Sequence, residues 1–294
     1  MRALVIGGAG MLGHRLYATL RPAHETFVTV RKAADRYAAL GIFDRSHLID
    51  RVDALVDADL ERAFGIARPE VAINCVGIIK QLREAEDPLT AIAVNALLPH
   101  RLARLCGARG ARLVHVSTDC VFSGTKGHYI EADFPDPRDL YGRSKLLGEV
   151  GSAEGITLRT SMIGREIDTR SGLVEWFLGQ RGGKVSGFRR AIYSGFTTAV
   201  LSRIILDVID RHRDLSGVWH VSSDPIDKFS LLSLVNTAFG LGIAIDPDDT
   251  FACDRSLDAT RFRVSAGFSP PSWPDMIAEL RADTTPYDRW RAER

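Results

Sequence analysis

The sequence has few cysteines and no long hydrophobic run. Its four cysteines, Cys75, Cys106, Cys120 and Cys253, include no CxxC pair, so the spacing predicts neither a zinc site nor a redox dithiol, and we expect no metal. Because four cysteines in 294 residues are too few for a disulfide framework, we expect a reducing, cytoplasmic setting. No stretch reaches the roughly 20 apolar residues that span a bilayer, so we expect no membrane association.

Neither sign of charge is in excess. The 38 Lys and Arg residues nearly balance the 37 Asp and Glu residues, and the formal net charge is +1. Without a long basic run, the chain lacks the electrostatic footprint of a nucleic-acid-binding protein, and we expect no nucleic-acid partner. With 45% hydrophobic residues, the chain has enough apolar material for one large domain or two unequal ones.

Short apolar runs alternate with helical segments through the first half of the chain. The runs that predict strands are 3–6, 27–30, 71–76, 112–117 and 156–159. The segments with helical spacing between them are 11–20, 57–66, 88–109 and 140–150. This alternation predicts an α/β fold with a doubly wound parallel (Rossmann) sheet that is covered on both faces.

The pattern loosens after residue 159, and the tail from Asp246 is rich in Asp and Pro. We expect this tail to form mostly loops and short elements. The sequence therefore predicts two parts. Residues 1–158 and 191–223 would form the NAD(P)-binding Rossmann domain, and residues 159–190 and 224–294 a smaller C-terminal substrate-binding lobe.

A glycine-rich turn follows the first predicted strand and opens the first predicted helix. Gly7, Gly10 and Gly13 have the spacing GxxGxxG, with Met11 and Leu12 inside the turn. Glycine lets the backbone approach a pyrophosphate, and the helix N-terminus then offers free N–H groups and a positive dipole end. We predict that these five residues bind a dinucleotide.

Other cofactor contacts are expected at the following strand ends. Arg31 follows the second strand where an acid would bind a ribose diol, and a cation there pairs with a 2′-phosphate. The cofactor is therefore predicted to be NADP (NADPH), with NAD as the alternative. Cys75, Val76 and Gly77 end another strand, where their backbone would line the cofactor.

A second constellation predicts the chemistry. Tyr141 and Lys145 form a YxxxK motif, which places a phenol and an ammonium one helical turn apart. Because a phenol titrates near ~10, we expect the ammonium to lower its pKa. Ser117 and Thr118 end a strand shortly upstream, where either hydroxyl is placed to hydrogen-bond a substrate carbonyl oxygen.

Segments 117–127 and 141–149, taken with the glycine turn, resemble the dTDP-4-dehydrorhamnose reductase family of extended short-chain dehydrogenase/reductases. The resemblance is strong in the first half of the chain and weak in the second. It implies that NADPH reduces the C4 ketone of a nucleotide-linked 4-keto-6-deoxysugar. Thr118, Tyr141 and Lys145 would form the catalytic triad, in which Tyr141 protonates the C4 oxygen, Thr118 orients it and Lys145 holds the cofactor ribose.

The resemblance also implies further contacts and a homodimer. Asp53 would face the adenine amino group, and Ser117 would line the cofactor. The predicted substrate-binding residues are Asp119, Cys120, Ser161, Tyr193 and Arg255. Arg255 lies where extended members use arginine against a nucleotide diphosphate. Cys120 departs from the family, which has tyrosine at this position, and this leaves the identity of the sugar open.

Two alternatives to a reductase remain. One is a nucleotide-sugar epimerase with tightly bound NAD(P), which takes a hydride and returns it. The other is a non-catalytic, dinucleotide-binding regulatory subunit, which the intact Thr118, Tyr141 and Lys145 disfavour. A dehydratase is also disfavoured, because Asp119-Cys120 follows Thr118 in place of an Asp-Glu pair.

Overall fold

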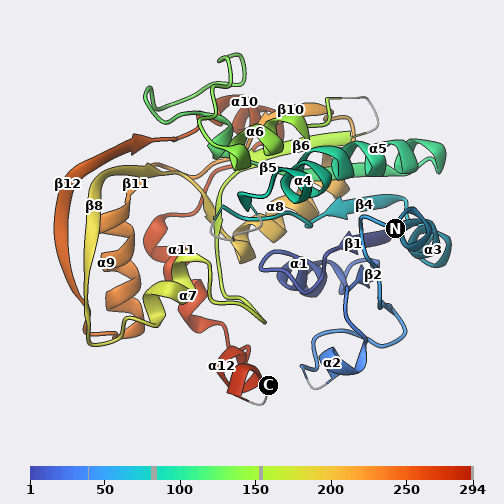
Figure 1. Cartoon of the computed structure of the whole chain (residues 1–294), viewed down its shortest axis with the longest axis horizontal. Helices are drawn as coiled ribbons and strands as arrows, with labels where there is room; N and C mark the ends of the chain where they lie inside the picture. The colour runs from blue at the N-terminus through green and yellow to red at the C-terminus, as the bar shows by residue number, and fades with distance from the viewer. Residues whose placement is uncertain (39, 81–84, 152–154, 293–294) are drawn as a thin grey trace.

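The computed structural model describes residues 1–38, 40–80, 85–151 and 155–292 (Figure 1). Among these, seven strands form one sheet in the order β10-β6-β5-β4-β1-β2-β3. All neighbouring strands run parallel. The strands are β1 (Arg2–Ile6), β2 (Glu25–Thr29), β3 (Leu48–Ile49), β4 (Val71–Asn74), β5 (Arg112–Thr118), β6 (Gly155–Thr160) and β10 (Gly217–His220). The predicted doubly wound parallel sheet is confirmed.

Helices cover both faces of this sheet. They are α1 (Gly13–Leu20), α2 (Asp35–Ala38), α3 (Asp57–Ala67), α4 (Pro88–Ala91), the π-helical η2 (Ile92–Leu97), α5 (Leu98–Ala108), α6 (Leu140–Leu147) and α8 (Thr198–Arg211). Because side chains alternate along a strand, β1 sends Val5 into the cluster with α1 and α8, and Leu4 into the cluster with α3 and α5. The sheet is therefore buried between two apolar layers.

A second, three-stranded sheet stands beside the first, at the left of Figure 1. It contains β8 (Lys184–Tyr193), β11 (Ile226–Asp227) and β12 (Ala244–Asp254), and a short pair is formed by β7 (Met162–Ile163) and β9 (Phe196–Thr197). The accompanying helices are α7 (Leu173–Leu178), α9 (Lys228–Phe239), α10 (Thr260–Ala266), α11 (Trp273–Ala282) and α12 (Tyr287–Ala292).

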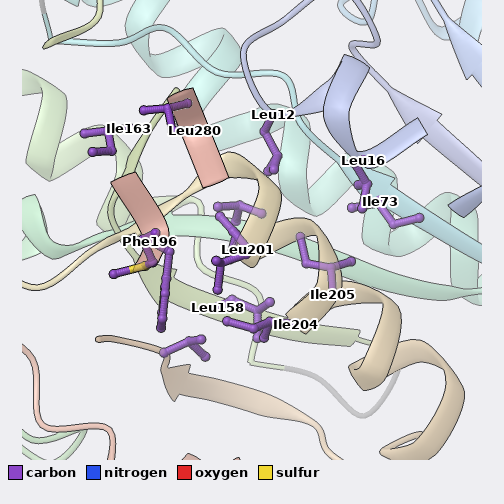
Figure 2. Close-up of a cluster of buried hydrophobic side chains, with 14 of the residues drawn as sticks. Leu12, Leu16, Ile73, Leu158, Ile163, Phe196, Leu201, Ile204, Ile205 and Leu280 are labelled. Carbon is purple, nitrogen blue, oxygen red and sulfur yellow. The ribbon is translucent and has the colours of Figure 1, made fainter. Parts of the chain in front are cut away.

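The core runs continuously from the main sheet toward this second region. Figure 2 shows Leu158 of β6, Leu201 of α8 and Leu280 of α11 in one buried cluster. Packing of this kind ties α11 to the Rossmann part of the chain. The division into 1–158 with 191–223 and 159–190 with 224–294 stays a prediction.

No helix in the described ranges is long and apolar enough to cross a membrane.

The tail corrects one expectation. Residues from Asp246 were expected to form mostly loops, yet 244–254 form the long strand β12, parallel to β8. Pro247 is tolerated because β12 lies at the edge of its sheet. The acidic residues face solvent and pair with cations of β8: Asp246 with Lys184 at 2.6 Å, and Asp249 with Arg189. The Asp-rich and Pro-rich composition therefore led to the prediction of a loop where the chain forms an exposed, charged edge strand.

The strand order predicts a ligand-binding crevice at the carboxyl ends of the strands of the main sheet. The order reverses between β1 and β4, and ligands in such sheets bind outside the carboxyl ends of the strands at this switch point. The glycine turn follows β1, residues 75–77 follow β4, and Thr118 ends β5. The fold thus brings the predicted cofactor and catalytic residues to the same edge.

Candidate active site

The glycine turn is built for a close backbone approach. Gly7 has φ +91°, a left-handed conformation that favours glycine, and its N–H donates to the Thr29 hydroxyl at 3.1 Å. A Cβ on Gly13 would lie 2.2 Å from the Gly7 carbonyl oxygen, so α1 starts directly against the turn. Leu12, at the N-cap, supplies no side-chain hydrogen bond to the helix start. The N–H groups there suit a phosphate group.

Two cavities lie on either side of this turn. The first, of about 340 Å³, lies beside β4 and α6. The predicted cofactor residues that line it are Gly10, Met11, Leu12, Cys75, Val76, Gly77, Ser117, Tyr141 and Lys145. The turn, the strand ends and α6 therefore line one cavity, which we call the cofactor trough after the prediction.

The second cavity, of about 400 Å³, contains Gly7, Arg31 and Asp53. The Asp53 carboxylate accepts a hydrogen bond from the Leu55 N–H at 2.9 Å. Arg31 is exposed at the cavity and, within the described part of the chain, forms no ion pair. Every predicted cofactor residue except Gly13 thus lines one of these two cavities, and Gly13 is buried beneath the turn.

Helix α6 positions the predicted catalytic pair. Asp139 caps its N-terminus by accepting from the Gly142 N–H at 2.8 Å. A Cβ on Gly142 would lie 2.3 Å from the Cys120 carbonyl oxygen, so the helix packs tightly on the segment after β5. The Lys145 ammonium donates to the Val116 carbonyl oxygen at 2.8 Å. This bond anchors the lysine to β5, beside the cofactor trough.

The protonation of this pair differs from the expectation. Burial raises the pKa of the Tyr141 phenol, nearby Cys120 adds to the effect, and a hydrogen bond with Thr118 opposes it. Burial also lowers the pKa of Lys145 to about 8. The net shift of the Tyr141 pKa is therefore opposite to the lowering that was expected from Lys145, because burial dominates. A protonated phenol is the form that can act as a general acid.

Asn95 connects the two halves of the site. It lies in η2, a π-helical segment of the kind that often marks functional sites. Its Oδ1 accepts from the Ile78 N–H at 3.0 Å, and its Nδ2 donates to the Ser144 hydroxyl at 3.3 Å. Asn95 therefore connects the loop after β4 to α6.

A third cavity, of about 350 Å³, adjoins the cofactor trough. All the predicted substrate residues line it together with Thr118 and Tyr141: Asp119, Cys120, Ser161, Tyr193 and Arg255. Burial raises the pKa of Asp119, and the Arg255 guanidinium opposes that shift. The Thr118 hydroxyl donates to the Asp119 carboxylate at 3.1 Å. The structure gathers these residues in one place, and their role as substrate ligands stays a prediction.

Sequence reasoning missed several lining residues. In the substrate cavity these include Lys228, Phe251 and Cys253, which come from α9 and β12. In the cofactor trough they include Glu166, Ile167, Asp168 and Thr169. None of them belongs to a motif, and only the packing of the second sheet and of segment 164–172 brings them to the site.

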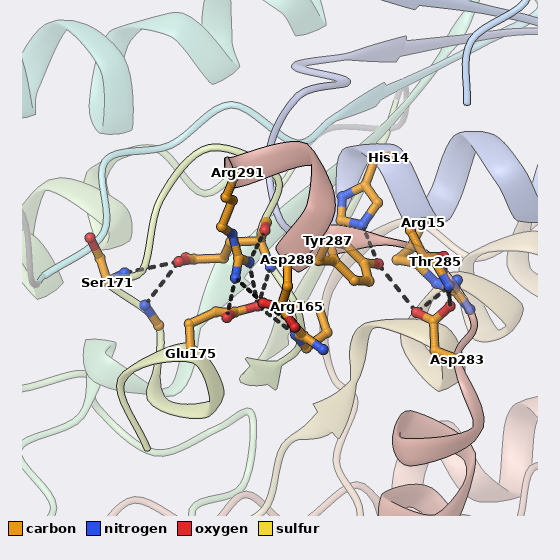
Figure 3. A network of polar contacts seen from close by, with 12 residues as sticks. His14, Arg15, Arg165, Ser171, Glu175, Asp283, Thr285, Tyr287, Asp288 and Arg291 are labelled. Atoms are coloured by element: carbon orange, nitrogen blue, oxygen red, sulfur yellow. Dashed lines mark hydrogen bonds and ion pairs between the residues drawn. The ribbon is translucent and has the colours of Figure 1, made fainter. Parts of the chain in front are cut away.

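The C-terminal helix braces this segment and the glycine turn. Arg291 of α12 and Arg165 both pair with the buried Glu175 at 2.6 Å, and the network continues to Ser171 and Asp288 (Figure 3). Burial lowers the pKa of His14 to about 4, so its ring is neutral. Its Nδ1 donates to the Gly10 carbonyl oxygen at 2.8 Å, and its Nε2 shares a hydrogen bond with the Tyr287 hydroxyl at 2.9 Å.

Comparisons with known proteins agree with this arrangement. A family model described as RmlD substrate binding domain matches residues 1–239. The chain is 29% identical to the probable low-salt glycan biosynthesis reductase Agl14 of Haloferax volcanii, over 98% of this chain and 99% of that protein. It is 36% identical to the dTDP-4-dehydrorhamnose reductase of Streptomyces griseus, over 50% of this chain and 43% of that protein.

A solved structure has the same fold. The dTDP-4-dehydrorhamnose reductase of Bacillus anthracis, in complex with NADP, superposes with a TM-score of 0.79. The superposition covers 96% of this chain and 99% of that chain, at 23% identity. At this level of identity the likeness shows the fold.

Proposed function

This chain belongs to the family described as the RmlD substrate binding domain, and from that membership we propose that it reduces a nucleotide-linked 4-keto-6-deoxysugar with NADPH. It is an NAD(P)-dependent oxidoreductase of the extended short-chain dehydrogenase/reductase type. One observation carries the proposal: Tyr141 lines both the cofactor trough and the substrate cavity. Its phenol would thus stand between a dinucleotide in one cavity and a sugar in the other.

The residues around Tyr141 fit the reduction of a ketone. The buried phenol is protonated, and we assign it the transfer of its proton to the ketone oxygen. Thr118, whose hydroxyl donates to Asp119, would turn this donor to the same oxygen when a substrate binds. Lys145, held by Val116, would bind the cofactor ribose. The nicotinamide supplies the hydride when bound.

The choice of NADPH rests on Arg31. Its guanidinium stands at the cavity that also holds Asp53, with no carboxylate pairing with it among the described residues. Arginine matches a phosphate with a bidentate fork, and a 2′-phosphate is the group that distinguishes NADP from NAD. The NADP complex of the Bacillus anthracis reductase is in line with this choice.

The sugar is defined here only as a class. Cys120, a small side chain, lines the cavity beside Tyr141, so the sugar pocket has room where a larger residue would reduce it. The test is a panel of nucleotide-linked 4-ketosugars, offered with NADPH. We expect at least one to be reduced to the alcohol with one NADPH consumed per sugar.

The same assay separates the alternatives. Conversion of a nucleotide sugar to its epimer without net NADPH consumption would assign an epimerase instead. Binding of NADPH with no turnover of any sugar would favour a regulatory subunit. We also propose a cytoplasmic homodimer, and sedimentation of the pure protein tests its oligomeric state.

A further inference from the structure

Lys228 presents a cation to the substrate cavity, and no motif accounts for it. It is the first residue of α9, and it lines the cavity with Tyr141 and Asp119. Strand β11 leads into it, and its register fixes Ile226 opposite Tyr193 of β8. The Lys228 ammonium lies 3.9 Å from the centre of the Tyr193 ring. Two regular elements therefore hold this charge in place.

Among the described residues, no carboxylate forms an ion pair with the Lys228 ammonium. Within the described residues, Lys228 forms no ion pair within 4.0 Å and donates no hydrogen bond, and its ammonium lies over the Tyr193 ring. The adjacent Asp227 is committed to capping α9, because it accepts from the Ser230 N–H at 2.8 Å and from the Ser230 hydroxyl at 2.7 Å. A cation at a helix N-terminus also faces the positive end of the helix dipole.

The rest of the cavity does not neutralise it. The charged or titratable groups that face Lys228 are Asp119, Cys120 and Cys253, and burial lowers the pKa of Lys228 to about 8. Asp119 also faces Arg255, so its single carboxylate faces two cations, Arg255 and Lys228. The remaining cation of the cavity, Lys80, is paired with Asp139 at 2.6 Å. The cavity therefore keeps an excess of positive charge.

We propose that Lys228 is a substrate-binding residue that takes an anionic oxygen of the substrate and so determines which substrates bind. Lys228 is half-buried, and removing an ammonium from water without an ion pair costs free energy, so an incoming oxyanion would stabilise it through charge-assisted hydrogen bonds. This assignment rests on the proposed function, since the substrate class there carries a diphosphate. The same chemistry is offered by a carboxylate on the sugar, and the two sources are separable by experiment.

The test measures binding to the NADP-saturated protein by calorimetry. The probes are UDP and dTDP for the diphosphate, uridine as the uncharged match, and UDP-glucuronate against UDP-glucose for the carboxylate. The variants are Lys228→Met and Lys228→Arg, with Lys184→Met as the control. Lys184 lies on β8 and is exposed, and it pairs with Asp246 outside the cavity.

If Lys228 binds the diphosphate, Lys228→Met weakens UDP and dTDP binding at least ~tenfold, or ~1.4 kcal/mol, and leaves uridine unchanged. The dissociation constants of Lys228→Arg stay within about threefold of those of the unaltered protein, because the charge remains. Those of Lys184→Met equal those of the unaltered protein. If Lys228 binds a sugar carboxylate, only the preference for UDP-glucuronate over UDP-glucose falls. Equal binding of every probe by Lys228→Met and the unaltered protein overturns the assignment.

A second measurement covers the case in which Lys228→Met does not fold. Binding of the anionic probe to the unaltered protein should weaken as the pH rises through about 8, where Lys228 loses its charge, and Lys228→Arg should lack that step. Matching pH profiles for the two proteins overturn the assignment. Failure of every ketosugar to turn over, with Lys228-dependent binding intact, would instead reject the proposed reaction alone.

Discussion

Gly13 gives the sharpest test of the dinucleotide turn. In Gly13→Ala the new Cβ would stand 2.2 Å from the Gly7 carbonyl oxygen and 2.9 Å from both the Gly7 carbonyl carbon and the Gly8 Cα. All three are backbone atoms, so no flexible side chain can move aside. The turn must retreat by about 0.8 Å to reach a 3.0 Å separation, the shortest that real Cβ atoms show.

The magnitude follows from this displacement. Overpacking of a tight site typically costs about 1–3 kcal/mol of unfolding free energy. Because the displaced atoms belong to the turn that would hold the pyrophosphate, NADPH affinity should also fall at least ~tenfold, or ~1.4 kcal/mol. The change is one methyl group, so neither charge nor polarity contributes to the expected loss.

Gly65→Ala is the matched control. Gly65 is exposed inside α3, and a Cβ there would meet nothing within 4 Å. Alanine in a helix interior is favoured over glycine by about 0.5–1 kcal/mol, so this variant should be more stable and bind NADPH unchanged. Denaturant unfolding and a fluorescence titration with NADPH measure both quantities. Normal stability and normal NADPH affinity in Gly13→Ala would refute the close-approach argument.

Three further predictions concern charges at the site. Glu149→Gln should lower the unfolding free energy by about 3–5 kcal/mol, because Glu149 and Arg159 form a buried bidentate ion pair at 2.7 Å. A loss below about 1 kcal/mol in a denaturant titration would contradict this expectation. Arg31→Ala should weaken NADPH binding while sparing NADH, and equal affinities of the unaltered protein for the two cofactors would remove Arg31 from the account. Because the pKa of Lys145 is about 8, its charge is present below that pH and lost above it. The dissociation constant for NADPH should therefore rise as the pH increases through about 8, and the variant Lys145→Met should show no such rise. A dissociation constant of the unaltered protein that does not change with pH would contradict this role of Lys145.

Local sequence patterns pointed to residues that line the candidate cofactor cavities. The glycine spacing and the strand ends depend on short stretches of chain, so Gly7, Arg31 and Gly77 could be found before the fold was known. They line the expected cavities, since parallel strands carry their carboxyl ends to one edge of the sheet. Tyr141 and Lys145 of α6 line the same region for the same reason, and their catalytic roles stay a prediction.

Features that depend on contacts between distant parts of the chain could not be predicted from the sequence. Lys228 reaches the cavity only because β11 pairs with β8, and no local signal marks a lysine at a helix start as a ligand. Tyr287 contacts His14 across 273 residues of chain. The pKa of Tyr141 depends on how deeply the folded chain buries the phenol, which the YxxxK spacing does not report.

The central claim is that Tyr141 delivers the proton in a ketone reduction. Its most direct test is the variant Tyr141→Phe, which removes one hydroxyl at the junction of the two cavities. With a ketosugar identified from the panel, we predict that the variant binds NADPH as the unaltered protein does, while turnover falls at least ~100-fold, the scale of a lost general acid. Full turnover by Tyr141→Phe would contradict the claim.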